Sequence, residues 1–301
     1  MSSVKLPRLP ESLSTTGIAT LCLIMAMVLW SSSFIALKIA FRGYDPHVVI
    51  FGRMLVASIC FMAVFKRIAN GFNYRKGDYK LLLFMVLCEP CFYFLFEAKA
   101  VENTSASQAG VITAILPVLV MIAAAFFLKE FISRKSWAGA IAALIGVIWL
   151  TLASAPDNTA PHPVLGNFLE FMAMVCATGY TISLKYLTSR YSPFMLTALQ
   201  AFVGCIFYLP ILFLPSTTLP EKISWQPTLA IIYLGGIITI GAYGLYNFAI
   251  KQVPANKAAS FVNLIPIFAV ILGWLVLGET LNISQIFAGC LIMAGVYLTQ
   301  K

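Results

Sequence analysis

Charge is what this sequence lacks most. Only 10% of its 301 residues are Asp, Glu, Lys or Arg, whereas a soluble domain carries about 25%. So few charged side chains cannot cover the surface of a water-soluble globule of this size, and a soluble enzyme is excluded first. The 60% of apolar residues and the 13% of aromatic residues also exclude a disordered chain. A polytopic membrane protein remains.

Groups that carry catalysis or bind metals are scarce as well. The chain has two histidines, His47 and His162, both expected near the outer surface, so neither a metal cluster nor a histidine-based hydrolase is expected. No Gly-x-x-x-x-Gly-Lys-Ser/Thr loop occurs, so ATP-driven transport within this chain is unsupported. The seven cysteines fall inside apolar runs and do not resemble a disulfide framework. We expect no metal, no cofactor and no enzyme activity.

Long apolar runs are what the sequence has in abundance. A span needs about 20 apolar residues to cross a hydrocarbon core about 30 Å thick. Ten such runs follow one another, and proline marks several of their starts, at Pro46, Pro193, Pro227 and Pro254. The runs cover residues 17–40, 46–65, 79–100, 104–128, 134–153, 164–187, 193–214, 227–250, 255–277 and 284–299. The sequence therefore predicts an all-α integral membrane protein with ten transmembrane helices.

The distribution of basic residues predicts the orientation of these helices. Fifteen of the twenty Lys and Arg residues fall in the tail 1–16, in alternate connections or at the C-terminus, and four fall in the other connections. Basic residues concentrate on the cytoplasmic side of membrane proteins, so we expect both termini in the cytoplasm and the protein in a bacterial inner membrane. The net charge of +9 is then mainly a topology signal, and no nucleic-acid partner is expected.

The two halves of the chain resemble each other. Residues 46–53 align with residues 193–200, and matched positions continue through several helices. The matched pairs are Lys38 with Lys185, Ala109 with Ala258, Pro117 with Pro266, Glu130 with Glu279 and Gly146 with Gly295. Five spans is an odd number, so the second half enters the membrane from the opposite side. The expected units are a cytosolic tail 1–16, inverted repeats 17–153 and 164–301 around a central cavity, and a periplasmic linker 154–163.

This pattern resembles a known family of transporters. The two five-span halves, the Trp-Ser-Ser-Ser-Phe stretch from Trp30 to Phe34, Arg53 in the second span and the repeated Pro…Glu…Gly-Val signature are similar to the EamA-like branch of the drug/metabolite transporter superfamily. The resemblance implies transport of small metabolites, most often export. It also implies that spans one to four and six to nine surround the cavity, with spans five and ten at the periphery. The second half departs from the first in having Gln200 where the first has Arg53.

Ionisable groups at membrane depth are the first candidates for function. Glu89 and Glu97 lie four residues on either side of Tyr93, so all three are expected near one face of a helix. Glu89 can bind a substrate amine, carry a coupled proton, or serve as a structural carboxyl group, and these alternatives stay open. Glu97 is expected to pair with Lys99 near the outer interface.

Aromatic and amide side chains complete the expected cavity, because rings stack on planar or apolar solutes and amides satisfy zwitterions. These candidates are Trp30, Phe34, Tyr93, Tyr180, Thr181, Tyr243, Tyr246, Asn247 and Asn263. Arg53 is favoured as a structural charge over a ligand for a substrate carboxylate, and Glu170 is expected in an outer vestibule. Pro90, Pro117 and Pro266 are predicted hinges, because proline within a helix leaves a carbonyl unbonded.

Together these features predict a secondary transporter that moves a small organic metabolite, such as an amino acid or drug-like solute, by alternating access, with export favoured. The alternatives are an intramembrane enzyme acting on lipid and a structural subunit of a membrane complex. The first would need a cluster of His, Asp, Glu or Lys that the short loops do not hold, and the second needs no inverted repeat. Expected partners are the bilayer and the substrate, with proton coupling through Glu89 as a hypothesis. The ridge Ala138, Ala142 and Gly146 predicts close helix packing and leaves a monomer or a homodimer open.

Overall fold

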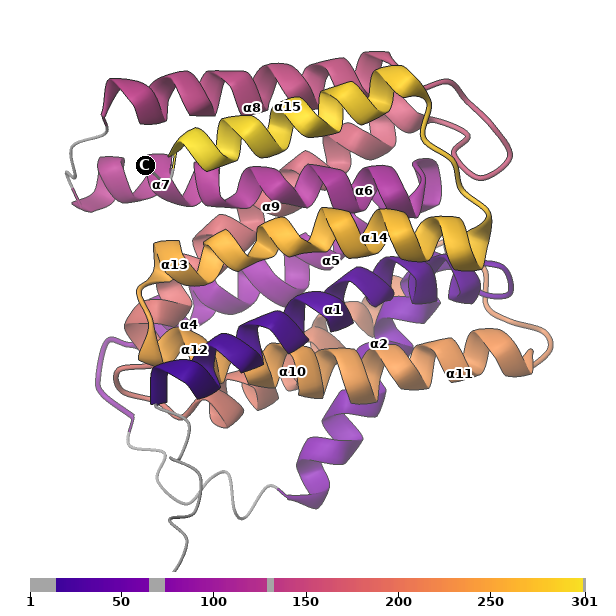
Figure 1. Cartoon of the computed structure of the whole chain (residues 1–301). Coiled ribbons are helices and arrows are strands. Elements are labelled where there is room, and N and C mark those ends of the chain that lie inside the picture. The colour runs from indigo at the N-terminus through magenta and orange to yellow at the C-terminus, as the bar shows by residue number, and fades with distance from the viewer. Residues whose placement is uncertain (1–14, 65–73, 129–132, 300–301) are drawn as a thin grey trace, which may run out of the picture.

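The computed structural model describes residues 15–64, 74–128 and 133–299, and every regular element within these ranges is a helix (Figure 1). The all-α prediction is thus confirmed for the described residues. Residues 1–14 of the expected tail lie outside them, and so do Glu130 and the C-terminal Lys301. All seven cysteines are free, as predicted.

Residues up to 152 form five helical segments within the described ranges. The first two are α1 (Thr15–Phe41) and α2 (Pro46–Ala63). The third joins α4 (Tyr79–Val86), η1 (Leu87–Phe92) and α5 (Tyr93–Asn103). The fourth joins α6 (Ala106–Ile112), η2 (Thr113–Ile115) and α7 (Leu116–Leu128), and the fifth is α8 (Arg134–Leu152).

Five further helical segments follow in the described ranges. They begin with α9 (Pro163–Leu187), and with α10 (Pro193–Tyr208) followed by η3 (Pro210–Phe213). The next joins α11 (Trp225–Tyr233), η4 (Leu234–Ala242) and α12 (Tyr243–Gln252). The last two are α13 (Ala255–Ser260) with η5 (Phe261–Leu264), α14 (Ile265–Leu272) and η6 (Gly273–Leu277), and then α15 (Ile283–Thr299).

Eight helices among the described residues are long and apolar enough to cross a membrane, so the protein is a multi-pass membrane protein. They are residues 17–41, 46–63, 79–103, 106–127, 134–152, 193–213, 225–252 and 257–277. α15 is shorter, at 17 residues. α9 is not among the eight, and it carries polar residues such as Asn167, Glu170 and Thr181 that are buried against other helices. The total of ten spans therefore stays a prediction.

Proline begins several helices, because the N–H groups of the first turn form no hydrogen bond within the helix, so the N–H that proline lacks is not needed there. α2, α9 and α10 begin at Pro46, Pro163 and Pro193. Asp45 caps α2 by accepting a hydrogen bond from the amide of His47 at 2.8 Å. Local chemistry in the sequence thus sets these helix starts.

The outer surface of the bundle is apolar. Phe126, Phe127 and Leu152 are 78%, 80% and 75% exposed on it. Soluble monomers rarely expose broad apolar surfaces, because each such surface costs free energy in water. This outer surface suits contact with lipid, whereas most of the polar side chains of α9 point inward.

α8 and α15 pack along each other at one side of the bundle (Figure 1). A Cβ atom added at Gly139 would lie 2.5 Å from the carbonyl oxygen of Gly295, so small residues bring the two backbones together. The packing face of α8 runs through Gly139, Ala143 and Gly146, whereas Ala138 is exposed. The predicted ridge is wrong by one residue at its first two positions, because the packing face follows spacings of four and then three residues. The small residues of this face contact α15 of the same chain.

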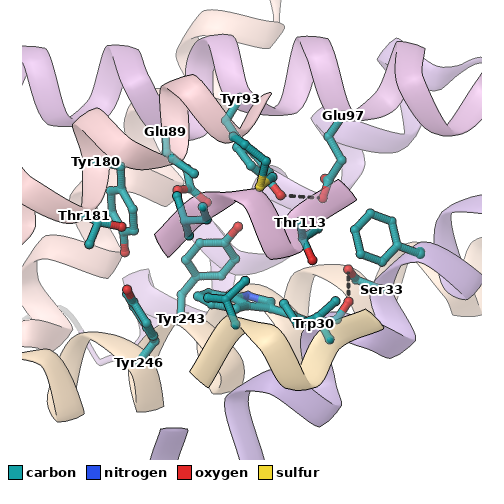
Figure 2. Close-up of a pocket in the computed structure, with 16 residues that line it drawn as sticks. Trp30, Ser33, Glu89, Tyr93, Glu97, Thr113, Tyr180, Thr181, Tyr243 and Tyr246 are labelled. Carbon is teal, nitrogen blue, oxygen red and sulfur yellow. Dashed lines mark hydrogen bonds between the residues drawn. The ribbon is translucent and has the colours of Figure 1, made fainter. Parts of the chain in front are cut away.

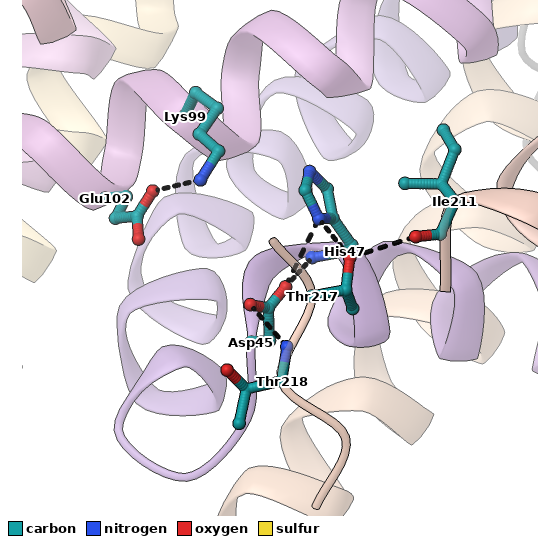
Figure 3. A network of polar contacts seen from close by, with 7 residues as sticks. All are labelled: Asp45, His47, Lys99, Glu102, Ile211, Thr217 and Thr218. Carbon is teal, nitrogen blue, oxygen red and sulfur yellow. Dashed lines mark hydrogen bonds and ion pairs between the residues drawn. The ribbon is translucent and has the colours of Figure 1, made fainter. Parts of the chain in front are cut away.

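Connections that are far apart in sequence meet at one end of the bundle (Figure 1). There the ammonium group of Lys38 donates a hydrogen bond to the carbonyl of Thr159. Figure 3 shows a second link, in which His47 Nδ1 lies 2.9 Å from Thr217 Oγ1. The connections 42–45, 153–162 and 214–224 therefore share this end.

Candidate functional site

A small cavity lies in the interior of the bundle (Figure 2). α1, η1, α5, η2 and α7 wall it from the first half of the chain, and α9, α12, η5 and α14 from the second. Its lining residues are Trp30, Ser33, Phe34, Glu89, Tyr93, Glu97, Thr113, Leu116, Met174, Ala177, Tyr180, Thr181, Tyr243, Tyr246, Val262 and Ile265. The space open to the centre of a water-sized sphere is about 40 Å³, which holds a few water molecules. The cavity is therefore narrow.

Aromatic rings form much of the wall. The ring centroid of Trp30 lies 5.0 Å from that of Tyr243 and 4.9 Å from that of Tyr246. The centroid of Tyr180 lies 6.4 Å from that of Tyr243. Edge and tilted contacts of this kind hold the rings in place. The buried indole N–H of Trp30 has no hydrogen-bond partner among the described residues, so it is a donor that a ligand can use.

Glu89 lies where the third helical segment breaks. It sits in η1 with φ −150° and ψ 118°, just before Pro90. Side chains of α10 bind the carbonyls that the break leaves unbonded: Gln200 Nε2 donates to the carbonyl of Glu89 at 3.1 Å, and the hydroxyl of Tyr208 donates to the carbonyls of Pro90 and Cys91. The predicted kink at Pro90 is thus present and stabilised by α10, while the hinge motion stays a prediction.

The side chain of Glu89 forms no ion pair among the described residues, although the charge of Arg53 acts on it. It is 3% exposed, and the hydroxyl of Tyr243 lies within hydrogen-bonding reach of it. None of the ion pairs found within residues 15–64, 74–128 and 133–299 includes it. A buried carboxylate without an ion-pair partner costs several kcal/mol, unless a proton or a cation compensates it. This side of the cavity therefore attracts a proton or a cationic group.

Arg53 lies behind the cavity wall and is 1% exposed. Its Nε donates to Thr239 Oγ1 at 2.8 Å, and its Nη1 lies 3.6 Å from Glu97 Oε2. Its Cζ lies 4.0 Å from the ring centroid of Phe94, a cation–π contact. These contacts tie α2 to α5 and η4, a geometry that suits the structural role expected of Arg53.

The pairing predicted for Glu97 is wrong. Glu97 is 3% exposed, accepts a hydrogen bond from the hydroxyl of Tyr93 at 3.0 Å and pairs with Arg53. Lys99 pairs instead with Glu102, at 2.9 Å. The reason is helical phase: residues 93 and 97 are one turn apart on the buried face, whereas residues 99 and 102 lie on a more exposed one. The same phase was the signal that could have placed Glu97 in the cavity wall.

Glu170 faces no outer vestibule, contrary to the prediction. Its side chain is fully buried, and neither carboxyl oxygen has a hydrogen-bond partner among the described residues. It interacts electrostatically with Glu97, on the helix α5 that packs against α9. Glu170 thus belongs to the interior of the bundle.

Most of the residues predicted for the cavity line it, and two do not. Those that do are Trp30, Phe34, Glu89, Tyr93, Tyr180, Thr181, Tyr243 and Tyr246. Asn247 is fully buried behind the wall, where it accepts a hydrogen bond from Tyr180 and donates one to Thr197 at 2.8 Å. Asn263 in η5 does not line the cavity either, because its neighbours Val262 and Ile265 hold the facing positions.

Pro117 and Pro266 occupy matched local structures. Each is the second residue of an α-helix that follows a short 3₁₀ turn, η2 before α7 and η5 before α14. Residues in each turn and at each helix start line the cavity: Thr113 and Leu116 in the first half, Val262 and Ile265 in the second. The sequence analysis did not predict that these four residues line the cavity, because their positions depend on 3₁₀ turns that no sequence motif indicates. The hinge role of the two prolines stays a prediction.

Similarity to known proteins extends over nearly the whole chain. The sequence profile of the EamA-like transporter family matches residues 17–152 and, a second time, residues 164–300. The chain belongs to the EamA-like transporter family. Each of the two EamA matches covers five of the helical segments described above, and the cavity has walls from both.

Several relatives of this EamA-like protein are named as transporters. The uncharacterized transporter YetK of Bacillus subtilis is 25% identical over 288 residues, which cover 93% of this chain and 86% of YetK. An uncharacterized transporter of Archaeoglobus fulgidus is 26% identical over 281 residues, covering 93% of this chain and 96% of that protein. A probable terminal-alkyne amino-acid exporter of Streptantibioticus cattleyicolor is 23% identical over 291 residues, covering 94% of this chain and 93% of the exporter.

A solved crystal structure has a similar fold. It superposes with a TM-score of 0.64 at 21% identity and covers 96% of this chain and 98% of the other. At this identity the likeness concerns the fold alone. The family and its relatives together identify the EamA-like chain as a membrane transporter.

Proposed function

We propose that this EamA-like protein is a secondary transporter that exports a small organic metabolite across the bacterial inner membrane by alternating access. The observation that carries the proposal is the interior cavity, whose walls come from both EamA-matched segments. Two halves that share one cavity can open it first to one side and then to the other. One chain supplies all the lining residues of the cavity, so the proposal is compatible with a monomer and with a homodimer.

In this proposal the halves are inverted five-helix repeats, residues 17–153 and 164–301, joined by a periplasmic linker at 154–163. The matched lysines support it. Lys38 donates to the carbonyl of Thr159 near the end of α1, and Lys185 donates to the carbonyl of Val253 at 2.7 Å near the end of α9. α9 begins next to the linker that Lys38 contacts, so Lys185 acts at the opposite end of the bundle. A pair of equivalent contacts at opposite ends is what an inverted repeat produces.

The excess of basic residues in alternate connections supports cytoplasmic termini. Fusions of green fluorescent protein and of alkaline phosphatase to each terminus test this. We expect fluorescence and no phosphatase activity at both termini. Phosphatase activity at one terminus only would require an odd number of spans and end the proposal of ten.

The proposed substrate carries an amine on an apolar or aromatic body, as an amino acid or a drug-like amine does. Glu89 supplies a carboxyl group that forms no ion pair among the described residues, and the rings of Trp30, Tyr180 and Tyr243 supply π faces that attract cations. The name of the Streptantibioticus relative, an amino-acid exporter, agrees with this class. An intramembrane enzyme and a structural subunit lack comparable support, because the relatives above are named as transporters.

Exchange in proteoliposomes tests the proposal. A thermal-shift screen of the purified protein against amino acids and amines selects ligands, because a ligand that binds the native state raises its apparent stability. Liposomes loaded with a selected ligand should then take up the same labelled compound faster than protein-free liposomes. A ligand that stabilises the protein but shows no exchange would count against transport.

Glu89→Gln separates the roles of this carboxyl group. Gln keeps the shape of the side chain and removes its charge, so the protein should fold, while the pH dependence of exchange should disappear. Glu102→Gln is the matched control, because the side chain of Glu102 is 40% exposed and pairs with Lys99, away from the cavity lining. Unchanged pH dependence in Glu89→Gln would remove proton coupling from the proposal.

A further inference from the structure

A groove runs along the outer surface of the bundle, where α1 lies between α11 and α14 (Figure 1). Residues 32–42, the first residues of α11 and the end of the α14–η6 segment line it, and we name it the lipid groove. Its volume is about 530 Å³. All three segments belong to helices that are long and apolar enough to cross a membrane, so the lipid groove opens towards the bilayer.

The lipid groove is separate from the interior cavity. Ser33 and Phe34 line the cavity, whereas Ser32 and Ile35 line the groove. Successive residues of α1 thus face the two spaces, and this helix forms the wall between them.

The sizes of the side chains explain the shape of the lipid groove. Ala36 and Ala230 are buried and form its floor. Leu229 on α11 and Val276 on η6 stand on either side of α1 and are 53% and 54% exposed. An apolar channel of this kind is costly in water, whereas in a bilayer it accepts a hydrocarbon chain.

One end of the lipid groove offers no free polar group to a ligand. Ser32 Oγ lies 2.6 Å from the hydroxyl of Tyr233 and donates to the carbonyl of Leu29 at 2.6 Å. Ser32 and Arg42 are ten residues apart, so the groove is about 15 Å long. This length is about half of a hydrocarbon core about 30 Å thick, which is the depth of one leaflet.

Arg42 marks the other end of the lipid groove. It is exposed, follows the last residue of α1, and forms no ion pair within the described part of the chain. Lys38 and Lys99, which were expected on the same side of the membrane, are both engaged by other groups of the chain. Exposed Trp225 begins α11 at this end, and tryptophan concentrates at the membrane interface. The guanidinium therefore stands where the head groups of lipids lie.

We propose that the lipid groove binds one anionic phospholipid, with an acyl chain along α1 between Leu229 and Val276 and the phosphate at Arg42. Arginine keeps its positive charge in proteins, and its planar fork of N–H donors matches the oxygens of a phosphate. The amide of Gln226, which lines the same end, supplies a further donor to the head group. The bound lipid covers the outer face of α1, whose inner face lines the cavity.

Native mass spectrometry of the full chain, purified and delipidated in detergent, tests the proposal. The probes are dioleoyl phosphatidylglycerol and dioleoyl phosphatidylethanolamine, which share their acyl chains and differ in head-group charge. We expect saturable binding of one phosphatidylglycerol, with an affinity about fivefold above that for phosphatidylethanolamine. This factor is what one basic residue contributes near an anionic lipid surface.

Two variants separate the head-group contact from the chain contact. Arg42→Gln should remove the preference for phosphatidylglycerol, and the protein should fold because this side chain is exposed. Lys99→Gln is the matched control, since it removes the same charge outside the groove lining and should keep the preference. Leu229→Ser should weaken the binding of both lipids, whereas Leu144→Ser on α8, also exposed and outside the groove, should not.

Equal affinity of the wild-type protein for the two lipids would overturn the proposal, and so would a wild-type preference in Arg42→Gln. A loss of preference in Lys99→Gln as large as in Arg42→Gln would overturn it too, because the overall charge of the protein would then attract the lipid. Uptake of many phosphatidylglycerol molecules without saturation would reveal only non-specific lipid around the bundle. None of these measurements involves transport, so this proposal and the proposed function fail independently.

Discussion

Gly295→Ala measures how tightly the peripheral helices α8 and α15 pack. A Cβ at Gly295 would lie 2.5 Å from the amide nitrogen of Ala143 and 2.6 Å from the carbonyl oxygen of Gly139. Both are backbone atoms and cannot rotate away. Ordinary contact between such atoms begins at roughly 3.4 Å, so the helices must separate by about 1 Å. Overpacking of this size costs about 1–3 kcal/mol.

Gly289→Ala on the same helix is the matched control. Its added Cβ would lie 3.7 Å from Val111 Cγ1, an ordinary contact. Both substitutions gain the same helix propensity, about 1 kcal/mol, so the difference between them isolates the clash. We expect Gly295→Ala to be less stable than Gly289→Ala by about 1–3 kcal/mol, seen as a lower apparent Tm in one detergent at one scan rate. Equal melting of the two variants would refute the close approach of α8 and α15.

Three further changes test other contacts. Gly110→Ala should lower the apparent Tm, because its new Cβ would overlap the Cβ of Ala269 on α14, and adding Ala269→Gly should restore much of the loss; no restoration would contradict the contact. Glu279→Gln should cost about 1–2 kcal/mol, since the carboxylate accepts hydrogen bonds from the first amides of α6 at 2.9 and 2.8 Å, and faster hydrogen exchange at those amides checks it. Burial alone would raise the pKa of Asp157, but hydrogen bonds from Thr159 and the next amide outweigh it and lower the pKa below 3.8. The stabilising effect of Asp157 is therefore present above about pH 4 and lost as pH falls, so the Tm difference between wild type and Asp157→Asn should shrink towards acid.

The sequence predicted the helices well, because their length is set by the bilayer and their starts by local chemistry. The apolar run 17–40 corresponds to α1, and Pro46 and Pro193 begin α2 and α10 as predicted. α9 differs, because it is not among the eight helices that are long and apolar enough to cross a membrane. Thirteen of its 25 residues are buried, and polar ones such as Asn167 and Glu170 are among them. A helix that faces the cavity need not be strongly apolar, so its hydropathy alone does not decide whether it crosses the membrane.

The candidate site was harder to predict, because it depends on partners rather than on depth. Tyr93 and Glu89 both line the cavity, as the helical period predicts, although the segment breaks at Glu89. Glu97 was misplaced because Lys99 is close in sequence, although the two lie on different faces. The position of Asn247 depends on Tyr180, which comes from another helix, and no local pattern reports such a contact.

The inventory of interior charge also limits what the cavity can accept. Within the described part of the chain Arg53 is the cation beside the cavity, and it is already engaged by Glu97, Thr239 and the ring of Phe94. A solute with two carboxylates would therefore meet Glu89 and the aromatic wall without a cation free to compensate it. The positive charge of a solute with an amine is compensated instead, because the carboxyl group of Glu89 lies beside it when it leaves water. We therefore expect labelled amines and zwitterionic amino acids, but not dicarboxylates, to exchange in liposomes, and faster exchange of a dicarboxylate than of every amine would show that Arg53 leaves Glu97 to bind substrate.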